Sequence, residues 1–62
     1  MFGLYDNVII KANGLHGTIV DISKINGKTT YVVESDVEYV HGGYGDRWKL
    51  FDCSEAEIEK IK

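Results

Sequence analysis

The sequence predicts a small all-β domain. β-branched residues dominate short runs such as Val8–Ile10, and their restricted side chains pack well on a pleated sheet. Asn-Gly pairs, which favour the positive φ angles of tight turns, separate the runs at Asn13-Gly14 and Asn26-Gly27. Because the chain has 62 residues, we expect one domain, residues 1–62, with a small core.

The first two strands are expected over Asn7–Lys11 and Thr18–Ser23, on either side of the first Asn-Gly turn. Ile19 and Ile22 are three residues apart, so they would face opposite sides of a regular strand. A bulge near Val20-Asp21 would turn both side chains inward. The sequence therefore predicts an irregular, bent second strand.

A third strand is expected over Thr29–Ser35, after the hairpin turn at Asn26-Gly27. A fourth is expected over Arg47–Asp52, after a glycine-rich stretch. The residues of these two strands expected to point inward are Tyr31, Val33, Trp48 and Leu50.

The last nine residues predict a short helical turn followed by a closing strand. Ser54-Glu-Ala-Glu57 matches the capping box, in which the first and fourth residues satisfy each other's backbone amides. We expect the strand over Ile58–Ile61 to pair near the first strand. A C-terminal helix through Lys62 is the alternative, because Glu, Ala and Lys favour helix.

About the first half of the chain resembles the KOW-type segment of an SH3-like barrel. The matching residues are Val8-x-Ile10-Lys11, Gly14-Leu-His-Gly17-Thr-Ile19-Val-Asp-Ile22 and Tyr31-x-Val33. In such segments a strand pairs with another that starts at an obligatory glycine, and Gly17 fits that place. The resemblance implies a five-stranded SH3-like barrel with a short helical turn before the last strand. Members of this group often bind RNA or belong to ribosomal and transcription proteins.

Charge and cysteine content narrow the class of protein. The formal net charge of −3 argues against a strong non-specific nucleic-acid binder, whose affinity comes largely from Lys and Arg neutralising phosphates. The single cysteine, Cys53, excludes an intrachain disulfide and fits a reducing compartment. No apolar run approaches the ~20 residues that span a bilayer. We expect a cytoplasmic protein that does not associate with membranes.

Residues 38–48, here called the aromatic loop, are the leading candidate for binding a protein partner. Aromatic rings stack on peptide groups or bases, and Arg offers a planar fork of donors. In the alternative interpretation Trp48 and one tyrosine fill the small core. The candidate contact residues are Tyr39, His41, Tyr44, Arg47 and Trp48.

The sequence is also compatible with two further functions. A KOW-like domain would bind RNA or DNA through basic residues on the turns, namely Lys11, His16, Lys24 and Lys28. A small acidic protein of a mobile element would instead inhibit a host nucleic-acid enzyme by acidic mimicry. Pairing of open sheet edges would also permit a homo-oligomer.

Catalysis and metal binding are not expected. Cys53, His16 and His41 are the residues that could form a nucleophile pair or a zinc site. A structural zinc site needs four ligands at recognisable spacing, and a Cys–His nucleophile needs a third orienting group and a pocket. Since the sequence offers neither set, we expect no enzyme activity, no metal and no cofactor.

Overall fold

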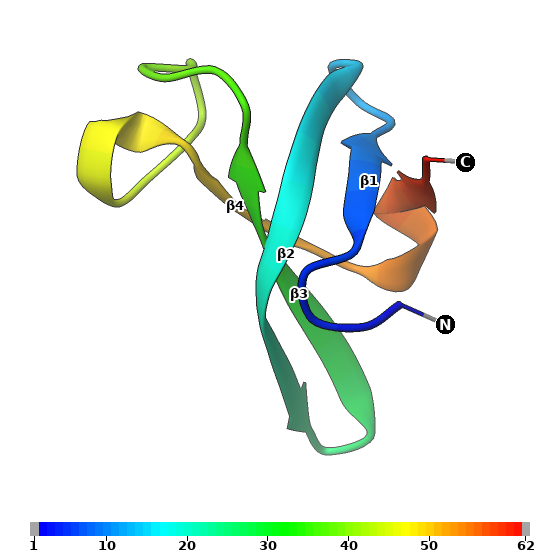
Figure 1. Ribbon diagram of the computed structural model, residues 1–62. Helices are drawn as coiled ribbons and strands as arrows, with labels where there is room; N and C mark the ends of the chain where they lie inside the picture. Colours follow the sequence, from blue (N-terminus) through cyan, green and yellow to red (C-terminus); the bar gives the residue numbers. More distant parts are fainter. Residues whose placement is uncertain (1, 62) are drawn as a thin grey trace.

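The computed structural model describes residues 2–61, which form one sheet of five antiparallel strands (Figure 1). The all-β prediction and the number of strands are confirmed. The elements are β1 (Asn7–Ile10), β2 (Leu15–Ile25), β3 (Lys28–Ser35), the 3-10 turn η1 (Asp46–Trp48), β4 (Leu50–Cys53), the 3-10 turn η2 (Glu55–Glu57) and β5 (Ile58–Lys60).

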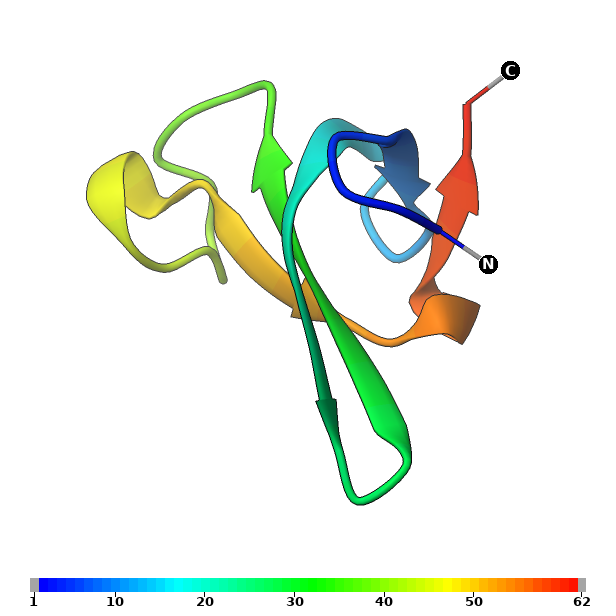
Figure 2. The same cartoon turned by 60° about the horizontal axis from the view of Figure 1, so that its bottom comes forward.

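The sheet is open, with strand order β4-β3-β2-β1-β5. Its edges, β4 and β5, do not pair with each other in the described part of the chain, so closure into a barrel is not confirmed. The chain instead crosses from one edge to the other through η2, as Figure 2 shows. The long β2–β3 hairpin extends away from the other strands (Figure 1).

The predicted bulge lies in β2. Ile19 is opposite Val33, whereas Asp21 is opposite the next β3 residue, Val32, so the register shifts between them. As a result Ile19 is fully buried, and Ile22 packs against the core from a partly buried position. The irregular apolar spacing of the sequence thus corresponds to an extra residue in the strand.

Gly17 lies where β3 approaches β2 too closely for a side chain. A Cβ atom there would lie 2.6 Å from Val33 Cγ1 and 2.7 Å from the Glu34 carbonyl oxygen. Because one of these neighbours is backbone, a rotamer change alone cannot make room. The glycine is therefore required by packing, although β2 begins two residues earlier, at Leu15.

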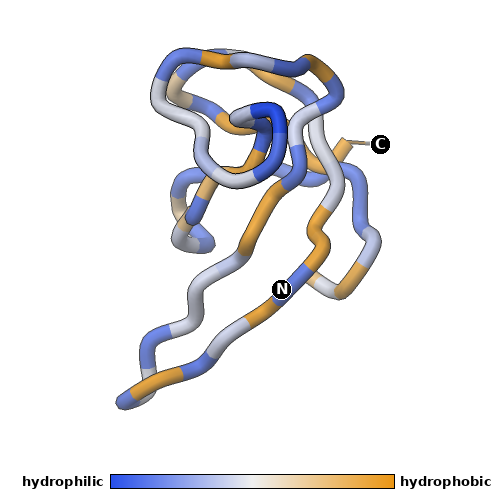
Figure 3. Tube along the Cα trace, turned by 90° about the vertical axis from the view of Figure 1, so that its left-hand side faces the viewer, coloured by the Kyte–Doolittle hydropathy of each residue, from blue (hydrophilic) through white to orange (hydrophobic). Residues whose placement is uncertain are grey.

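The core lies on one face of the curled sheet. Its buried side chains come from every strand and are Val8, Ile10, Ile19, Tyr31, Val33, Cys53 and Ile58. Phe2 adds an edge-to-face contact on Tyr31, with ring centroids 5.5 Å apart. In Figure 3 hydrophobic and hydrophilic stretches follow one another along the strands. Each aliphatic core side chain contributes about 1.5–3 kcal/mol by burial, which is a large share for so small a domain.

The predicted fourth strand was wrong at its start and in the face it buries. β4 begins at Leu50, and the side chain of Trp48 is 57% exposed. Phe51 and Cys53 are opposite the inward residues of β3, while Leu50 is opposite Glu34 and is only partly buried. A shift of one residue exchanges the two faces of a strand. The predictions for Tyr31 and Val33 are confirmed, since both are buried.

The C-terminal prediction of a turn and a strand is confirmed, and the alternative helix is wrong. The Ser54 backbone N–H donates to the Glu57 carboxylate at 2.7 Å, as the capping box requires. β5 then pairs with β1, and the Lys11 N–H donates to the Glu57 carbonyl oxygen at 3.0 Å. Lys62, the end of the alternative helix, lies outside the described residues.

Candidate protein-interaction surface

The aromatic loop belongs to a longer excursion, residues 36–49, that leaves the sheet after β3 and returns at β4 (Figure 1). Backbone hydrogen bonds join its two arms. The Tyr39 N–H donates to the Arg47 carbonyl oxygen at 2.6 Å, and the Val40 N–H donates to the Trp48 carbonyl oxygen at 3.3 Å. The Ser35 N–H also donates to the Lys49 carbonyl oxygen at 2.7 Å, which fixes the base of the excursion.

Two glycines allow the loop to fold back on itself. A Cβ atom on Gly43 would lie 2.0 Å from the Trp48 carbonyl oxygen. Gly45 has a φ of 76°, and a Cβ atom there would lie 2.6 Å from the Leu50 side chain. Gly43 therefore permits the close approach of the Trp48 backbone, and Gly45 leaves room for the Leu50 side chain.

Three non-glycine residues of the loop have left-handed backbone conformations. The φ angles are 57° at Tyr39, 56° at Arg47 and 53° at Trp48. Such a conformation costs roughly 1–2 kcal/mol per residue, and strained residues are often found at functional sites. All three residues are among the five predicted for partner contact. The strain therefore coincides with the candidate surface.

Tyr39 and Trp48 form an exposed aromatic pair. Their ring centroids are 6.0 Å apart and the rings meet edge to face at 72°. Exposed fractions of 65% for Tyr39 and 57% for Trp48 show that the pair lies outside the core. The alternative in which Trp48 fills the core is wrong.

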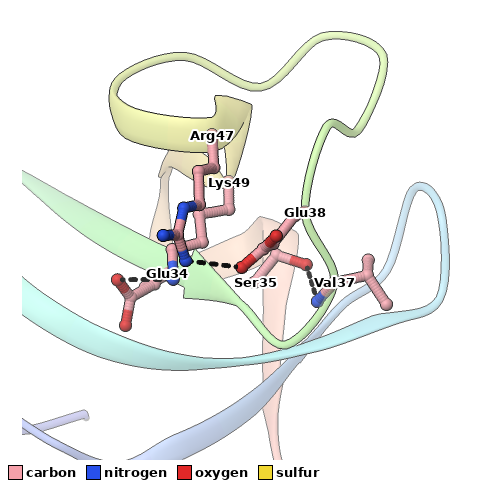
Figure 4. A network of polar contacts seen from close by, with 6 residues as sticks. All are labelled: Glu34, Ser35, Val37, Glu38, Arg47 and Lys49. Atoms are coloured by element: carbon pink, nitrogen blue, oxygen red, sulfur yellow. Dashed lines mark hydrogen bonds and ion pairs between the residues drawn. The ribbon is translucent and has the colours of Figure 1, made fainter.

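An ion pair joins the two arms of the loop (Figure 4). Arg47 Nη1 donates to Glu38 Oε2 at 3.0 Å, and both side chains are about half exposed. At the base of the loop, Lys49 Nζ lies 3.5 Å from Glu34 Oε2. Pairs this exposed contribute at most about 1 kcal/mol. Their main effect is to neutralise the two cations of the loop region.

The remaining two predicted contact residues, Tyr44 and His41, make contacts other than with Tyr39 and Trp48. Tyr44 exchanges two backbone hydrogen bonds of 3.0 Å with Leu50 at the edge of β4. Its hydroxyl donates to the Asp52 carboxylate, and this hydrogen bond raises the pKa of the phenol above its usual value. His41 is exposed in the turn that the Gly43 N–H closes onto the Val40 carbonyl oxygen.

The structure therefore brings together Tyr39, Arg47 and Trp48 from the predicted set. It also adds Glu38, which lies inside the predicted loop but was not among the five candidate contact residues. Glu38 and Arg47 are nine positions apart in sequence, and no helical or strand periodicity relates them. Only the folding back of the loop reveals this pair.

The residues predicted for nucleic-acid binding are not gathered on one patch. Lys11 and His16 lie at the β1–β2 turn, whereas Lys24 and Lys28 flank the tip of the β2–β3 hairpin. These places are at opposite ends of β2 (Figure 1), and about 26 Å of strand separates His16 from Lys24 at ~3.3 Å per residue.

Residues 2–61 offer little support for a metal site, a reactive cysteine or a membrane-spanning helix. No group of three or more His, Cys, Asp or Glu residues among them is placed to hold a metal ion. Cys53 is buried in the core, and burial raises the pKa of its thiol. None of the described helical segments has the length and apolar character to cross a membrane.

Comparison with protein-family models, with curated proteins and with solved structures finds no match to this chain.

Proposed function

We propose that this chain is a non-enzymatic interaction module that binds a protein partner through the aromatic loop. The carrying observation is the exposed pair of Tyr39 and Trp48, held edge to face at 6.0 Å on a loop whose arms are joined by hydrogen bonds. Tyrosine, tryptophan and arginine are the residues most enriched among those that dominate binding energy at interfaces. Tyr39, Trp48 and Arg47 supply one of each here.

The ordered state of the loop favours this proposal energetically. Two rings that already contact each other, and an arginine already held by Glu38, lose little side-chain freedom on binding. The backbone hydrogen bonds between the arms likewise reduce the ordering cost of the loop. A preorganised aromatic surface can therefore use more of its buried area as affinity.

We also propose that the five strands have the SH3-like barrel arrangement that the sequence resemblance implies. The close approach of β3 at Gly17 and the strand order agree with a KOW-type SH3-like arrangement. Nucleic-acid binding, which that resemblance would suggest, has less support because its candidate residues lie at opposite ends of β2. The protein-partner function is therefore preferred over it.

The proposal is tested with immobilised protein and a lysate of its natural source. Wild-type protein is compared with Trp48→Ala and with Ile25→Ala, which removes a side chain that is 69% exposed on the distant hairpin. We expect a captured protein that is lost with Trp48→Ala and kept with Ile25→Ala. Amide NMR spectra of each variant establish that the fold is intact.

Oligonucleotides at low and physiological salt provide the opposing arm of this experiment. Amide shifts at Lys11, His16, Lys24 and Lys28 that weaken as salt rises would contradict the proposal and support nucleic-acid binding. Capture that is equal for all three protein forms would also contradict it.

A further inference from the structure

The surplus negative charge of the chain is confined to the segment that carries the aromatic loop. Residues 34–52 hold five acidic and two basic side chains, whereas the rest of the chain holds five of each. The formal charge of −3 therefore lies wholly in this segment. The five carboxylates belong to Glu34, Asp36, Glu38, Asp46 and Asp52.

Internal ion pairs leave three of these carboxylates, those of Asp36, Asp46 and Asp52, without a cation among the described residues. Glu38 pairs with Arg47, and Glu34 pairs with Lys49. The Asp52 carboxylate accepts the hydrogen bond of the Tyr44 hydroxyl. Asp36 and Asp46 are exposed and form no salt bridge with the other described residues. The negative charge that no internal side-chain contact engages is thus on the two arms of the excursion, at Asp36 and Asp46.

The aromatic pair also favours a positively charged partner. An aromatic ring carries negative charge on its face and attracts a cation placed within ~6 Å of its centre. Tyr39 and Trp48 meet edge to face and are more than half exposed, so ring surface remains open to solvent beside Asp46 and Arg47 in the chain. Because Glu38 already neutralises Arg47, that residue opposes a cation only weakly.

We infer that the aromatic loop recognises a basic protein segment, one that places arginine or lysine side chains over Tyr39 and Trp48 and near Asp36 and Asp46. This inference rests on the proposed protein-binding function and specifies its partner class. Carboxylates repel phosphate groups, so the same surface disfavours nucleic acid and anionic lipid. The charge surplus and the exposed rings are independent observations that select the same chemistry.

The test is a selection from a displayed random-peptide library on wild-type protein, with peptides that also bind Trp48→Ala protein discarded. Enriched peptides are synthesised in two forms, one natural and one in which citrulline replaces arginine and acetyl-lysine replaces lysine. We expect enrichment of arginine and lysine, with affinity falling about three- to tenfold for each basic residue neutralised. The affinity of the natural peptide should also fall as salt rises.

A double variant, Asp36→Asn with Asp46→Asn, tests the carboxylates without removing any core side chain, since both residues are exposed. We expect the double variant to bind the natural peptide several-fold more weakly than wild-type protein does. Its affinity for the neutralised peptide should equal that of wild-type protein. Amide NMR of wild-type protein with the natural peptide should show shifts at Tyr39 and Trp48.

Three results would overturn the inference. Trp48-dependent peptides that keep their affinity when neutralised would refute the basic partner and leave protein binding by the loop standing. A selection that yields no Trp48-dependent peptide would refute both. Concentration-dependent amide shifts in protein alone, at the loop and at Lys24 and Lys28, would identify a second copy of the chain as the occupant instead.

Discussion

Replacing Gly43 with alanine should open the aromatic loop and leave the core folded. A Cβ atom there would lie 2.0 Å from the Trp48 carbonyl oxygen, whereas carbon and oxygen atoms in contact are normally about 3.3 Å apart. The two backbones must therefore separate by about 1.3 Å. That movement breaks the hydrogen bond from the Val40 N–H to the same oxygen.

The free energy that the closed loop loses follows from the overpacking and from the lost hydrogen bond. Overpacking costs about 1–3 kcal/mol and the lost hydrogen bond about 1 kcal/mol, so the closed loop should lose about 2–4 kcal/mol. None of the seven buried core residues lies in residues 36–49. We therefore expect the loss to appear as local opening, with a smaller change in the global free energy of unfolding.

Hydrogen exchange measured by NMR is the direct assay, because the Tyr39 and Val40 amides donate across the loop. Both should exchange faster in Gly43→Ala protein, while amides of β2 and β3 keep their protection. Trp48 is the sole tryptophan, so its fluorescence reports on the loop alone. Gly42→Ala is the matched control, since a Cβ atom there meets nothing within 4 Å and only the φ of 92° is strained. Equal exchange rates in the two variants would refute the reasoning.

Three further predictions concern the sheet and its ionisable groups. Gly17→Ala should lower the free energy of unfolding in urea by about 2–3 kcal/mol because β3 has no room for a methyl group, whereas Gly3→Ala should be nearly neutral; equal effects would contradict the packing described for Gly17. Ultraviolet titration should show a phenol with a pKa above 10.0 that disappears in Tyr44→Phe protein and moves down in Asp52→Asn protein. The pKa of Tyr44 is higher in the folded than in the unfolded protein, so the Tyr44–Asp52 hydrogen bond stabilises the folded state at pH values below the unfolded pKa near 10.0. This stabilisation is lost as the pH rises through the folded pKa. Cys53 should react with a thiol reagent only as fast as the protein opens, since it is buried and its thiol pKa is raised; rapid reaction in native buffer would place it at the surface.

The parts of the fold that were predicted correctly depend on local chemistry. Asn26-Gly27 takes positive φ at both residues and makes the β2–β3 hairpin. The spacing of Ile19 and Ile22 required an extra residue in β2, and the Ser54–Glu57 capping box required a turn. In each case neighbouring residues decide the conformation, so the sequence pattern is sufficient.

The start of β4 and the exposure of Trp48 could not be predicted in this way. Alternation in the sequence favoured an inward Trp48, but Arg47 and Trp48 adopt positive φ angles that neither residue type prefers. Those conformations are held by backbone bonds from Tyr39 and Val40 and by the space that Gly43 leaves. Contacts between the arms, which no local pattern encodes, therefore determine the candidate surface.

The pairing of Tyr44 with Leu50 has a consequence for the behaviour of the chain in concentrated solution. The outer edge of β4 would otherwise present unpaired peptide groups to any passing strand, which is how sheets join into aggregates. Tyr44 occupies the Leu50 peptide groups, and the other edge strand, β5, has only three residues. The excursion that carries the aromatic pair therefore also covers the sheet edge at Leu50. A partner that moved the loop away from the sheet would expose the Leu50 peptide groups, so such binding and resistance to aggregation would place opposing demands on Tyr44.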